Sequence, residues 1–399
     1  MIGMRSIHGI LLAVVLLGVS GCTSNRRTPM EAHDAAVVWM VENQNPDGSW
    51  GTIDASRPYQ IYLDTQSSHS AFGGATSALG VMSLVESSRG NPEAEASLRR
   101  GVEHLLTMPP VGKASGNTFY DIWTHTYVLS AMCRLVDDPR FAGDRDRIVA
   151  VLERELDILE NRQSLDGGWG YYDFDYILPN PSGDQSTSFN TAAVLLALQE
   201  ASDRGFSVDR NMMDDAIKAV ERMRLPSGAY VYGTYAQYRP QAPYNMVKGS
   251  LGRSQPCNLS LHELGRDISL EQMQEGVESL RRDHHYIEIG RGRKRPHEAY
   301  YSTSGYYYFF GHYYAGLVIE ELDEPDRSNL ARWLQDVMID VQDPGGSWFD
   351  YPLYGYGHPY GTAYGLLVLQ STRRALGTPD EPRAVSSADD AGSNRPDGR

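Results

Sequence analysis

Cysteine and positive charge are both scarce in this chain of 399 residues, which has 3 cysteines and a formal net charge of -15. Nucleic acids and anionic membrane surfaces attract proteins through clustered Lys and Arg side chains. The single basic run, residues 291–295, is short and interrupted by glycine, and we interpret it as a solvated loop. The composition therefore argues against a nucleic-acid partner, and the cysteine count is too low for a disulfide framework.

A hydrophobic run long enough to span a bilayer is also missing. The apolar segment near the N-terminus covers only Ile10–Val19, whereas a membrane span needs about 20 residues. Arg5 precedes this segment, as in a targeting sequence. The four residues that end at Cys22, Val-Ser-Gly-Cys, resemble the lipobox of bacterial lipoproteins. The resemblance implies cleavage before Cys22, lipidation of its thiol, and a lipid anchor to a bacterial membrane at the cell envelope, at the outer membrane or the periplasmic face.

One turn recurs three times along the chain. Gln44–Gly51 reads Gln-Asn-Pro-Asp-Gly-Ser-Trp-Gly, Gln163–Gly170 reads Gln-Ser-Leu-Asp-Gly-Gly-Trp-Gly, and Gln342–Trp348 reads Gln-Asp-Pro-Gly-Gly-Ser-Trp. The separations of these copies are close to two and three times one unit of about 60 residues, and residues 108–116 and 224–233 are worn copies. A fixed long period of this kind predicts a repeat architecture.

Charged, amphipathic segments alternate with apolar segments between these turns, and both types have helical spacing. The charged segments are residues 32–41, 93–106, 144–162, 208–223, 270–282 and 326–341, and their apolar partners are residues 70–85, 120–135, 187–200, 257–264, 301–322 and 361–376. The alternation predicts an all-α fold of six helical hairpins, with polar outer helices and apolar inner helices. Apolar residues on both sides of the inner helices favour closure into a ring, an α/α toroid.

The pattern Gln-x-x-Asp-Gly-x-Trp at the end of an outer helix resembles the QW repeat of squalene-hopene cyclases and oxidosqualene cyclases. Their superfamily includes the protein prenyltransferase β subunits. The resemblance covers residues 29–376 and implies the α/α toroid. We expect a signal peptide over residues 1–21, a polar tether over 22–28 and a disordered tail over 377–399. Structural rather than catalytic roles are expected for the Gln and Trp residues of the motif, Gln44, Trp50, Gln163, Trp169, Gln342 and Trp348.

The catalytic motifs of these families are missing. Hopene cyclases protonate their substrate with an Asp-x-Asp-Asp motif, which does not occur in the folded part of this sequence. Protein prenyltransferases hold zinc with an Asp-x-Cys pair and a distant His, but Gln255 stands where the Asp should precede Cys257. Cys257 and His312 alone do not make a zinc site, so we predict no metal and no cofactor. The Cys-Gly-Glu-Gln motif of toroidal thioester domains is absent as well.

In a closed toroid, the N-terminal ends of the inner helices meet at one mouth of a central cavity. The candidate catalytic residues at this mouth are His69, Asp121, His125, Asn190 and His358, most of which can transfer protons. The candidate ligand-binding residues are Trp123, Cys257, Tyr301, Tyr306, Tyr307, Tyr360 and Tyr364. Further tyrosines, at 171, 172, 232, 235, 354 and 356, suggest a cavity walled with phenols, which could bind an isoprenoid chain or stack on sugar rings.

The leading interpretation is an exported, terpenoid cyclase- or prenyltransferase-like lipoprotein that binds a small apolar or amphipathic ligand in an aromatic cavity. Two alternatives stay open: a polysaccharide lyase or glycosidase that acts on an oligosaccharide at the cell envelope, and a non-catalytic scaffold. A lyase would need cations near a uronate, for which Lys248 and Arg253 are the candidates. Two carboxylates across the cavity would favour glycoside hydrolysis, a His-Tyr-Arg cluster lyase chemistry, and an apolar aromatic wall lipid binding.

Overall fold

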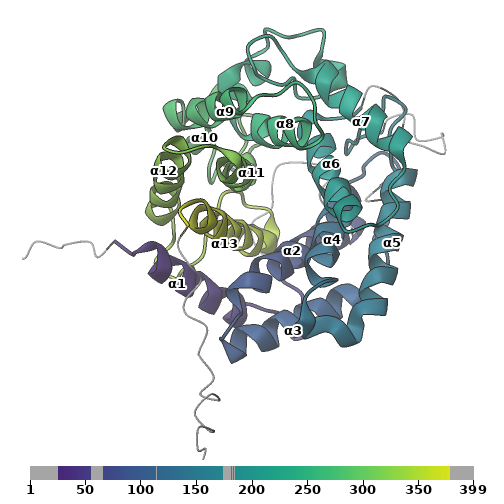
Figure 1. Cartoon of the computed structure of the whole chain (residues 1–399), viewed down its shortest axis with the longest axis vertical. Helices are drawn as coiled ribbons and strands as arrows, with labels where there is room; N and C mark the ends of the chain where they lie inside the picture. Colours follow the sequence, from purple (N-terminus) through teal and green to yellow (C-terminus); the bar gives the residue numbers. More distant parts are fainter. Residues whose placement is uncertain are drawn as a thin grey trace, which may run out of the picture.

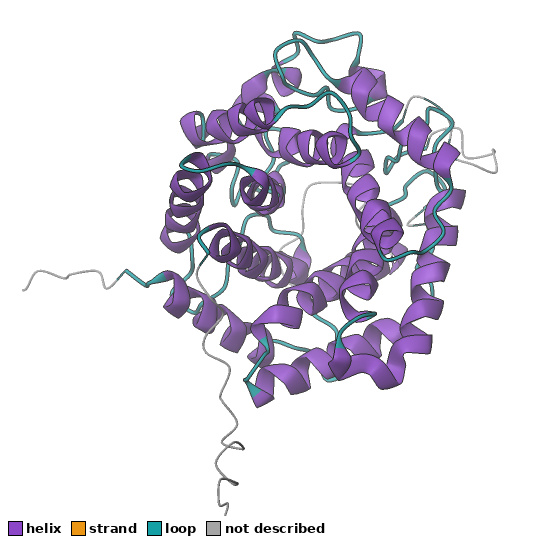
Figure 2. Cartoon of the chain, in the orientation of Figure 1, coloured by secondary structure: helices purple, strands orange, loops and turns teal. Residues whose placement is uncertain are grey.

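The computed structural model describes residues 26–54, 66–113, 115–173, 181, 183 and 185–377. These residues form α-helices and short 3-10 helices, with isolated bridges in place of strands (Figure 2). None of the described helices combines the length and the apolar character that a membrane crossing requires. Cys22 and the predicted signal peptide lie outside the described residues, as does the predicted tail beyond Gly377.

Two concentric rings of helices make up the fold (Figure 1). The outer ring consists of α1 (Pro29–Glu42), α3 (Pro92–Thr107), α5 (Arg145–Asn161), α7 (Arg210–Met223), α9 (Leu270–Arg282) and α12 (Asp326–Asp340). The inner ring consists of α2 (Gln66–Ser87), α4 (Asp121–Leu135), α6 (Ser188–Asp203), α8 (Leu251–Glu263), α11 (Tyr307–Glu321) and α13 (Gly357–Ala375). A short helix, α10 (His285–Glu288), precedes α11. The predicted α/α toroid of six hairpins is confirmed.

Small residues let the inner helices pack closely on their neighbours. A Cβ atom added to Gly74 of α2 would lie 2.6 Å from the Thr124 side chain of α4. A Cβ added to Gly80 would lie 2.8 Å from the ring of Trp50. The inner helices are therefore buried on nearly all sides, whereas outer helices such as α7 bury only one stripe, which includes Met212 and Val220.

Each of the three Gln-Trp turns connects the outer helix that it follows to another outer helix. The Gln163 side-chain amide donates to the carbonyl oxygens of Gly167 in its own turn, at 2.7 Å, and of Met212 in α7, at 2.8 Å. Trp169 is fully buried, and its indole N–H donates to the Leu159 carbonyl at the end of α5, at 2.9 Å. The copies at Gln44 and Gln342 make the equivalent bonds. The predicted structural role of this motif is confirmed.

The last copy of the turn closes the ring. The Gln342 amide donates to the Ala32 carbonyl oxygen of α1 at 2.7 Å, so the sixth hairpin is joined to the first. The worn copy that begins at Arg224 keeps the backbone geometry, because Arg224 and Tyr230 form the same antiparallel bridge as Gln44 and Trp50. A buried tyrosine replaces the tryptophan there.

Two inner helices differ from their predicted bounds. Helix α8 begins at Leu251, before the predicted start at residue 257, and contains Pro256. Helix α11 begins at Tyr307, after the predicted start at residue 301, because Tyr301 and Ser302 have left-handed φ values of 59° and 54°. These conformations are incompatible with a right-handed helix. The residues before α11 therefore form a loop at the end of the inner ring, together with the short 3-10 helix Tyr300–Ser302.

Candidate functional site

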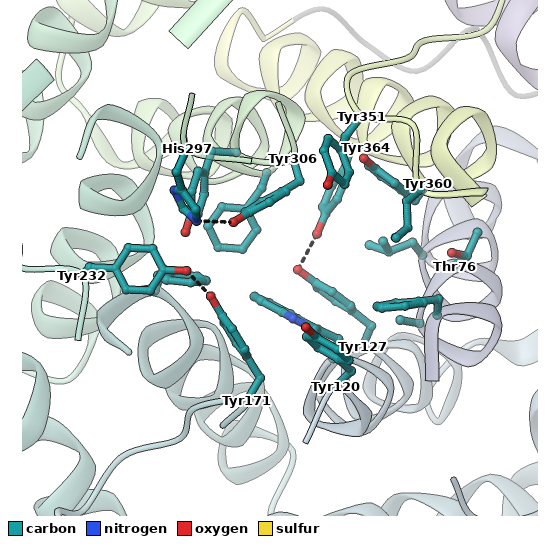
Figure 3. A pocket seen from close by; sticks show the side chains of 18 of the residues that line it. Thr76, Tyr120, Tyr127, Tyr171, Tyr232, His297, Tyr306, Tyr351, Tyr360 and Tyr364 are labelled. Carbon is teal, nitrogen blue, oxygen red and sulfur yellow. Dashed lines mark hydrogen bonds between the residues drawn. The ribbon is translucent and has the colours of Figure 1, made fainter. Parts of the chain in front are cut away.

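A cavity of about 560 Å³ lies within the inner ring (Figure 3). It is lined by Phe72, Ala75, Thr76, Leu79, Tyr120, Trp123, Tyr127, Tyr171, Tyr172, Phe189, Tyr232, Tyr235, Tyr244, His297, Ser302, Tyr306, Tyr307, Phe310, Tyr351, Leu353, Tyr360 and Tyr364. Sixteen of these 22 residues are aromatic, and twelve are tyrosines. None of the described lining residues is Asp, Glu, Lys or Arg. This described wall is therefore large, aromatic and free of charged side chains.

Four of the twelve phenol groups described in this wall form two hydrogen-bonded pairs. Tyr127 bonds to Tyr364, and Tyr171 bonds to Tyr232 (Figure 3). Burial raises the pKa of each of these four phenols well above its usual value, so all of them stay neutral near pH 7. Paired hydroxyls leave the faces and edges of the rings as the main surface available to a ligand.

A polar corner interrupts this aromatic wall, and we define it by His297, Tyr306, Tyr171 and Tyr232. The His297 Nδ1 atom lies 2.8 Å from the Ser302 carbonyl oxygen, which can only accept, so Nδ1 carries the hydrogen. The Nε2 atom is then the acceptor for the Tyr306 hydroxyl at 3.0 Å (Figure 3). The ring centres of His297 and Tyr232 are 5.7 Å apart, so the His297–Tyr306 pair and the Tyr171–Tyr232 pair are neighbours.

The loop that carries His297 has a strained backbone. His297, Tyr301 and Ser302 all have left-handed φ values, between 54° and 60°, although none of them is glycine. Hydrogen bonds hold the loop in place, because the His297 backbone N–H donates to the Ser304 hydroxyl at 2.8 Å. Burial of the imidazole by the surrounding wall lowers the pKa of His297, so the ring is neutral at pH 7. The loop thus holds one neutral imidazole in a fixed orientation at the cavity.

Behind the polar corner lies Arg253. Its guanidinium is 5.2 Å from the ring centre of Tyr232 and 5.5 Å from that of Tyr307, and the residue is 1% exposed. It donates to the Gly249 carbonyl oxygen at 2.8 Å. Lys248 lies outside the cavity, with Nζ 4.6 Å from the Tyr286 ring centre. Neither cation that we considered for lyase chemistry lines the cavity.

A second titratable group contacts the cavity wall from behind. Tyr360 donates its hydroxyl hydrogen to Asp350, whose other carboxylate oxygen accepts from the Phe309 backbone N–H at 3.2 Å. Asp350 is fully buried, and this burial raises its pKa to about 7, although the two hydrogen bonds and the charge of Arg291 oppose the change. Asp350 is therefore partly protonated at neutral pH.

Five of the seven predicted ligand-binding residues line the cavity: Trp123, Tyr306, Tyr307, Tyr360 and Tyr364. Cys257 is a free cysteine, fully buried in α8, and burial raises the pKa of its thiol. Tyr301 lies in a separate surface pocket, where its ring is 4.9 Å from that of Tyr286. The structure thus places Cys257 and Tyr301 outside the described cavity wall.

The predicted catalytic residues Asp121 and His125 lie together, but between α4 and α5. The His125 imidazole bonds to Glu155 through Nδ1, and its Nε2 atom is 3.5 Å from Asp121. Arg162 is 3.3 Å from Asp121, and Arg154 is 2.6 Å from Glu155. Burial would lower the pKa of His125, but the hydrogen bonds to the two carboxylates outweigh it and raise the pKa to about 9. This cluster is a buried ion-pair network outside the cavity lining.

The other three candidates are separate from one another. The His69 ring packs on Tyr354, with ring centres 4.5 Å apart. Asn190 is buried in α6, and neither atom of its side-chain amide has a hydrogen-bond partner. His358 is half exposed on α13, 3.7 Å from Asp343. None of the three lines the described cavity.

The pair that the zinc motif would need is also separated. The Nε2 atoms of His312 and His284 are 3.0 Å apart. Burial, together with the charge of His284, lowers the pKa of His312 to about 3. Cys257 instead lies in α8 near Ser188. Over the residues that the structure describes, no group of three or more His, Cys, Asp or Glu side chains could hold a metal ion.

His297 and Asp350 were missed by the sequence analysis. His297 lies in the loop that precedes α11, and the helix periodicity that guided our choice of site residues carries no information on such loops. Asp350 follows Trp348 of the last Gln-Trp turn by two residues, and this proximity to a recognised motif is the signal that could have identified it. The presence of a buried partner, Tyr360, was not readable from spacing alone.

Comparison with known proteins supports the fold assignment. No protein-family profile matches the sequence, and no curated protein matches it. The structure is similar to a variant of the type II terpene cyclase MstE from Scytonema in complex with its substrate, geranylgeranyl dihydroxybenzoate. That similarity has 14% identity and a TM-score of 0.50, and it covers 87% of this chain and 97% of the cyclase.

Two sugar-active proteins have a similar fold. An α-1,6-mannanase from Salegentibacter is 9% identical, with a TM-score of 0.54, over 87% of this chain and 100% of the mannanase. A cellobiose 2-epimerase from Spirochaeta thermophila is 17% identical, with a TM-score of 0.55, over 88% of this chain and 98% of the epimerase. The protein is an α/α toroid with a terpene cyclase-like fold and a large buried aromatic cluster. Identities this low show the fold and leave the reaction undetermined.

Proposed function

We propose that this protein binds a small apolar or amphipathic molecule of the isoprenoid type in its central cavity. The observation that carries the proposal is the wall itself, with sixteen aromatic residues and no charged residue among the described lining. A volume of about 560 Å³ suits a small molecule, since ligand pockets typically measure about 300–1,000 Å³. A ligand without charge loses little hydration free energy on entering such a site, and it buries apolar surface against the rings.

The described lining supports an apolar ligand better than it supports glycoside hydrolysis. Hydrolysis of a glycosidic bond normally uses two carboxyl groups on either side of the bond. Asp350 is the only carboxyl group with a described hydrogen bond to a lining side chain, and Tyr360 separates it from the cavity. Arg253, which lies behind the polar corner, contacts the rings of Tyr232 and Tyr307 and is not part of the described cavity lining.

The cellular location belongs to the same proposal. The lipobox-like sequence that ends at Cys22 supports export and attachment to a bacterial membrane by a lipid on that cysteine. A lipid-anchored protein with an apolar cavity would stay close to a source of apolar molecules. The ligand would then be a component or a product of the cell envelope.

A cavity-filling variant tests the binding proposal. Ala75 of α2 lines the cavity and is 8% exposed, so Ala75→Trp would occupy the space that a ligand needs. Native mass spectrometry of the protein purified from its own membranes should detect a bound apolar molecule in the wild type and not in this variant. Ala96→Trp, on the exposed face of α3, is the matched control and should retain the ligand. An empty cavity in the wild type would contradict the proposal.

A further inference from the structure

The polar corner contains hydroxyl groups that can form hydrogen bonds to a ligand. The Tyr306 hydroxyl donates its only hydrogen to His297, so its oxygen is left as a hydrogen-bond acceptor, which the hydroxyls of Ser304 and Tyr232 also approach. In the Tyr171–Tyr232 pair, one hydroxyl donates to the other, and the second hydrogen of the pair is available to a neighbouring oxygen, either that of Tyr306 or that of a ligand. One acceptor and one donor therefore lie side by side at the edge of an apolar cavity.

A third group in the same region also lacks a partner. The Tyr307 hydroxyl is buried and makes no hydrogen bond, although the residue lines the cavity and is only 3% exposed. Its ring is 4.6 Å from the Tyr306 ring and 5.2 Å from the Phe189 ring. A buried hydroxyl without a partner costs free energy, and a polar atom of a ligand would remove that cost.

The orientation of Tyr306 is fixed before any ligand arrives. His297 keeps its ring hydrogen on Nδ1, because the Ser302 carbonyl oxygen accepts that hydrogen at 2.8 Å. The Nε2 atom, which faces Tyr306, can therefore only accept. The bond from the His297 backbone N–H to the Ser304 hydroxyl, at 2.8 Å, also holds this strained loop in place. Tyr306 is thereby held as a hydrogen-bond acceptor toward the cavity.

We propose that the polar corner binds the hydroxyl group of an amphipathic ligand, such as a prenyl alcohol or a prenylated phenol, whose apolar chain fills the cavity. The Tyr306 oxygen accepts the hydrogen of the ligand hydroxyl, and the second hydrogen of the Tyr171–Tyr232 pair is donated to the ligand oxygen. This assignment rests on the proposed function and specifies the chemical class of the ligand. An ether of the same chain has no hydrogen to give to Tyr306 and is bound less tightly.

Binding of three matched probes tests this assignment: geranylgeraniol, its methyl ether and the corresponding hydrocarbon, each in competition with a fluorescent apolar dye. The wild type should bind the alcohol about 3- to 10-fold more tightly than the ether, the ratio that one net hydrogen bond provides. Tyr306→Phe keeps the ring and removes the acceptor, so it should bring this ratio close to one, and hydrocarbon binding by the variant verifies that its cavity is formed.

Two further variants separate the corner from the rest of the wall. His297→Asn suits the left-handed backbone and frees the Tyr306 hydrogen, so the ether should gain affinity relative to the alcohol. Tyr127→Phe removes a hydroxyl from the Tyr127–Tyr364 pair and should keep the wild-type ratio. Equal binding of alcohol and ether by the wild type, or an unchanged ratio in Tyr306→Phe, would overturn the assignment. Failure of all three probes to bind would instead count against the proposed function.

Discussion

The Nδ1 atom of His125 lies 2.5 Å from the Oε2 atom of Glu155, between the inner helix α4 and the outer helix α5. Both side chains are 1% exposed, so this contact is sealed from water inside the double ring. Asp121 and Arg162 extend it into a network of opposite charges. A histidine that looked suitable for proton transfer at the cavity thus joins an inner helix to an outer one.

The first prediction concerns the stability that His125 contributes at different pH values. The unfolded pKa of histidine is about 6.5, and the folded pKa of His125 is raised to about 9. The folded state therefore holds a proton that the unfolded state loses, and the stabilisation is complete below pH 6.5 and declines as pH rises toward 9. At about 1.4 kcal/mol per pKa unit, the loss is roughly 3 kcal/mol.

Urea denaturation of the wild type and of His125→Gln between pH 6 and pH 9.5 measures this effect. The free energy of unfolding of the wild type should fall toward that of the variant as pH rises. A difference between the two proteins that stays constant over this range would contradict the raised pKa.

Asp350 gives a second prediction, over a lower pH window. Its folded pKa is raised to about 7, compared with about 3.9 in unfolded chains, because burial disfavours the carboxylate. Tyr360, the Phe309 backbone N–H, Arg291 and Tyr308 are the groups that face it. Between pH 4 and 7 the folded state keeps a proton that the unfolded state loses, so stability falls with rising pH by about 1.4 kcal/mol per pH unit.

Asp350→Asn is the variant that isolates this effect, because the amide preserves the shape of the carboxyl group and has no proton to lose. The variant should become more stable relative to the wild type as pH rises from 4.5 to 7.5. Asp267→Asn, at an exposed position, should show no such trend. Parallel stability curves for the wild type and Asp350→Asn would argue against a raised pKa.

Gln342 leads to a third prediction, on closure of the ring. Gln342→Ala removes the bonds to Ala32 and Gly346 and leaves partly buried carbonyl groups without that donor. We expect a loss of about 1–3 kcal/mol in the free energy of unfolding. The same substitution at Gln163, which joins α5 to α7 within the chain, is the matched comparison and should cost a similar amount. An effect below about 0.5 kcal/mol at both positions would contradict the structural role of the motif.

Cys22 leads to a fourth prediction, on the anchor. Metabolic labelling with an alkyne-bearing fatty acid should mark the wild type, which should sediment with membranes. Cys22→Ala should lose both the label and the sedimentation. The remaining cysteines, Cys133 and Cys257, are buried and free, so their substitution by serine should not affect labelling. An unlabelled wild type, or equal labelling of the wild type and Cys22→Ala, would contradict lipidation at this position.

The architecture could be predicted from the sequence because the same turn and the same pair of segments recur along the chain. The Gln-Trp turns mark the ends of outer helices, and the change between charged and apolar segments separates the two rings. Much of the cavity wall was readable too, since Tyr306, Tyr307, Tyr360 and Tyr364 stand at or near the starts of inner helices. Aromatic residues that follow one another on a helix cannot all point the same way, so some of them have to face the centre.

The directions of individual polar side chains were harder to predict. On α4, Trp123 and Tyr127 are four residues apart and share the face that lines the cavity. Asp121 and His125 are offset from them by two residues, about half a helical turn, and so they face α5. The same offset separates His358 from Tyr360 on α13. Helix periodicity relates these residues to one another, but only packing shows which face is inside.

The hydrogen bond between Gln342 and Ala32 affects how this protein unfolds. An open array of repeats exposes a terminal unit at each end, which frays before the rest. Here the first hairpin is held by the last, so every hairpin has two neighbours. Thermal or chemical unfolding therefore has no preferred starting point, and the toroid should lose its structure in one cooperative transition.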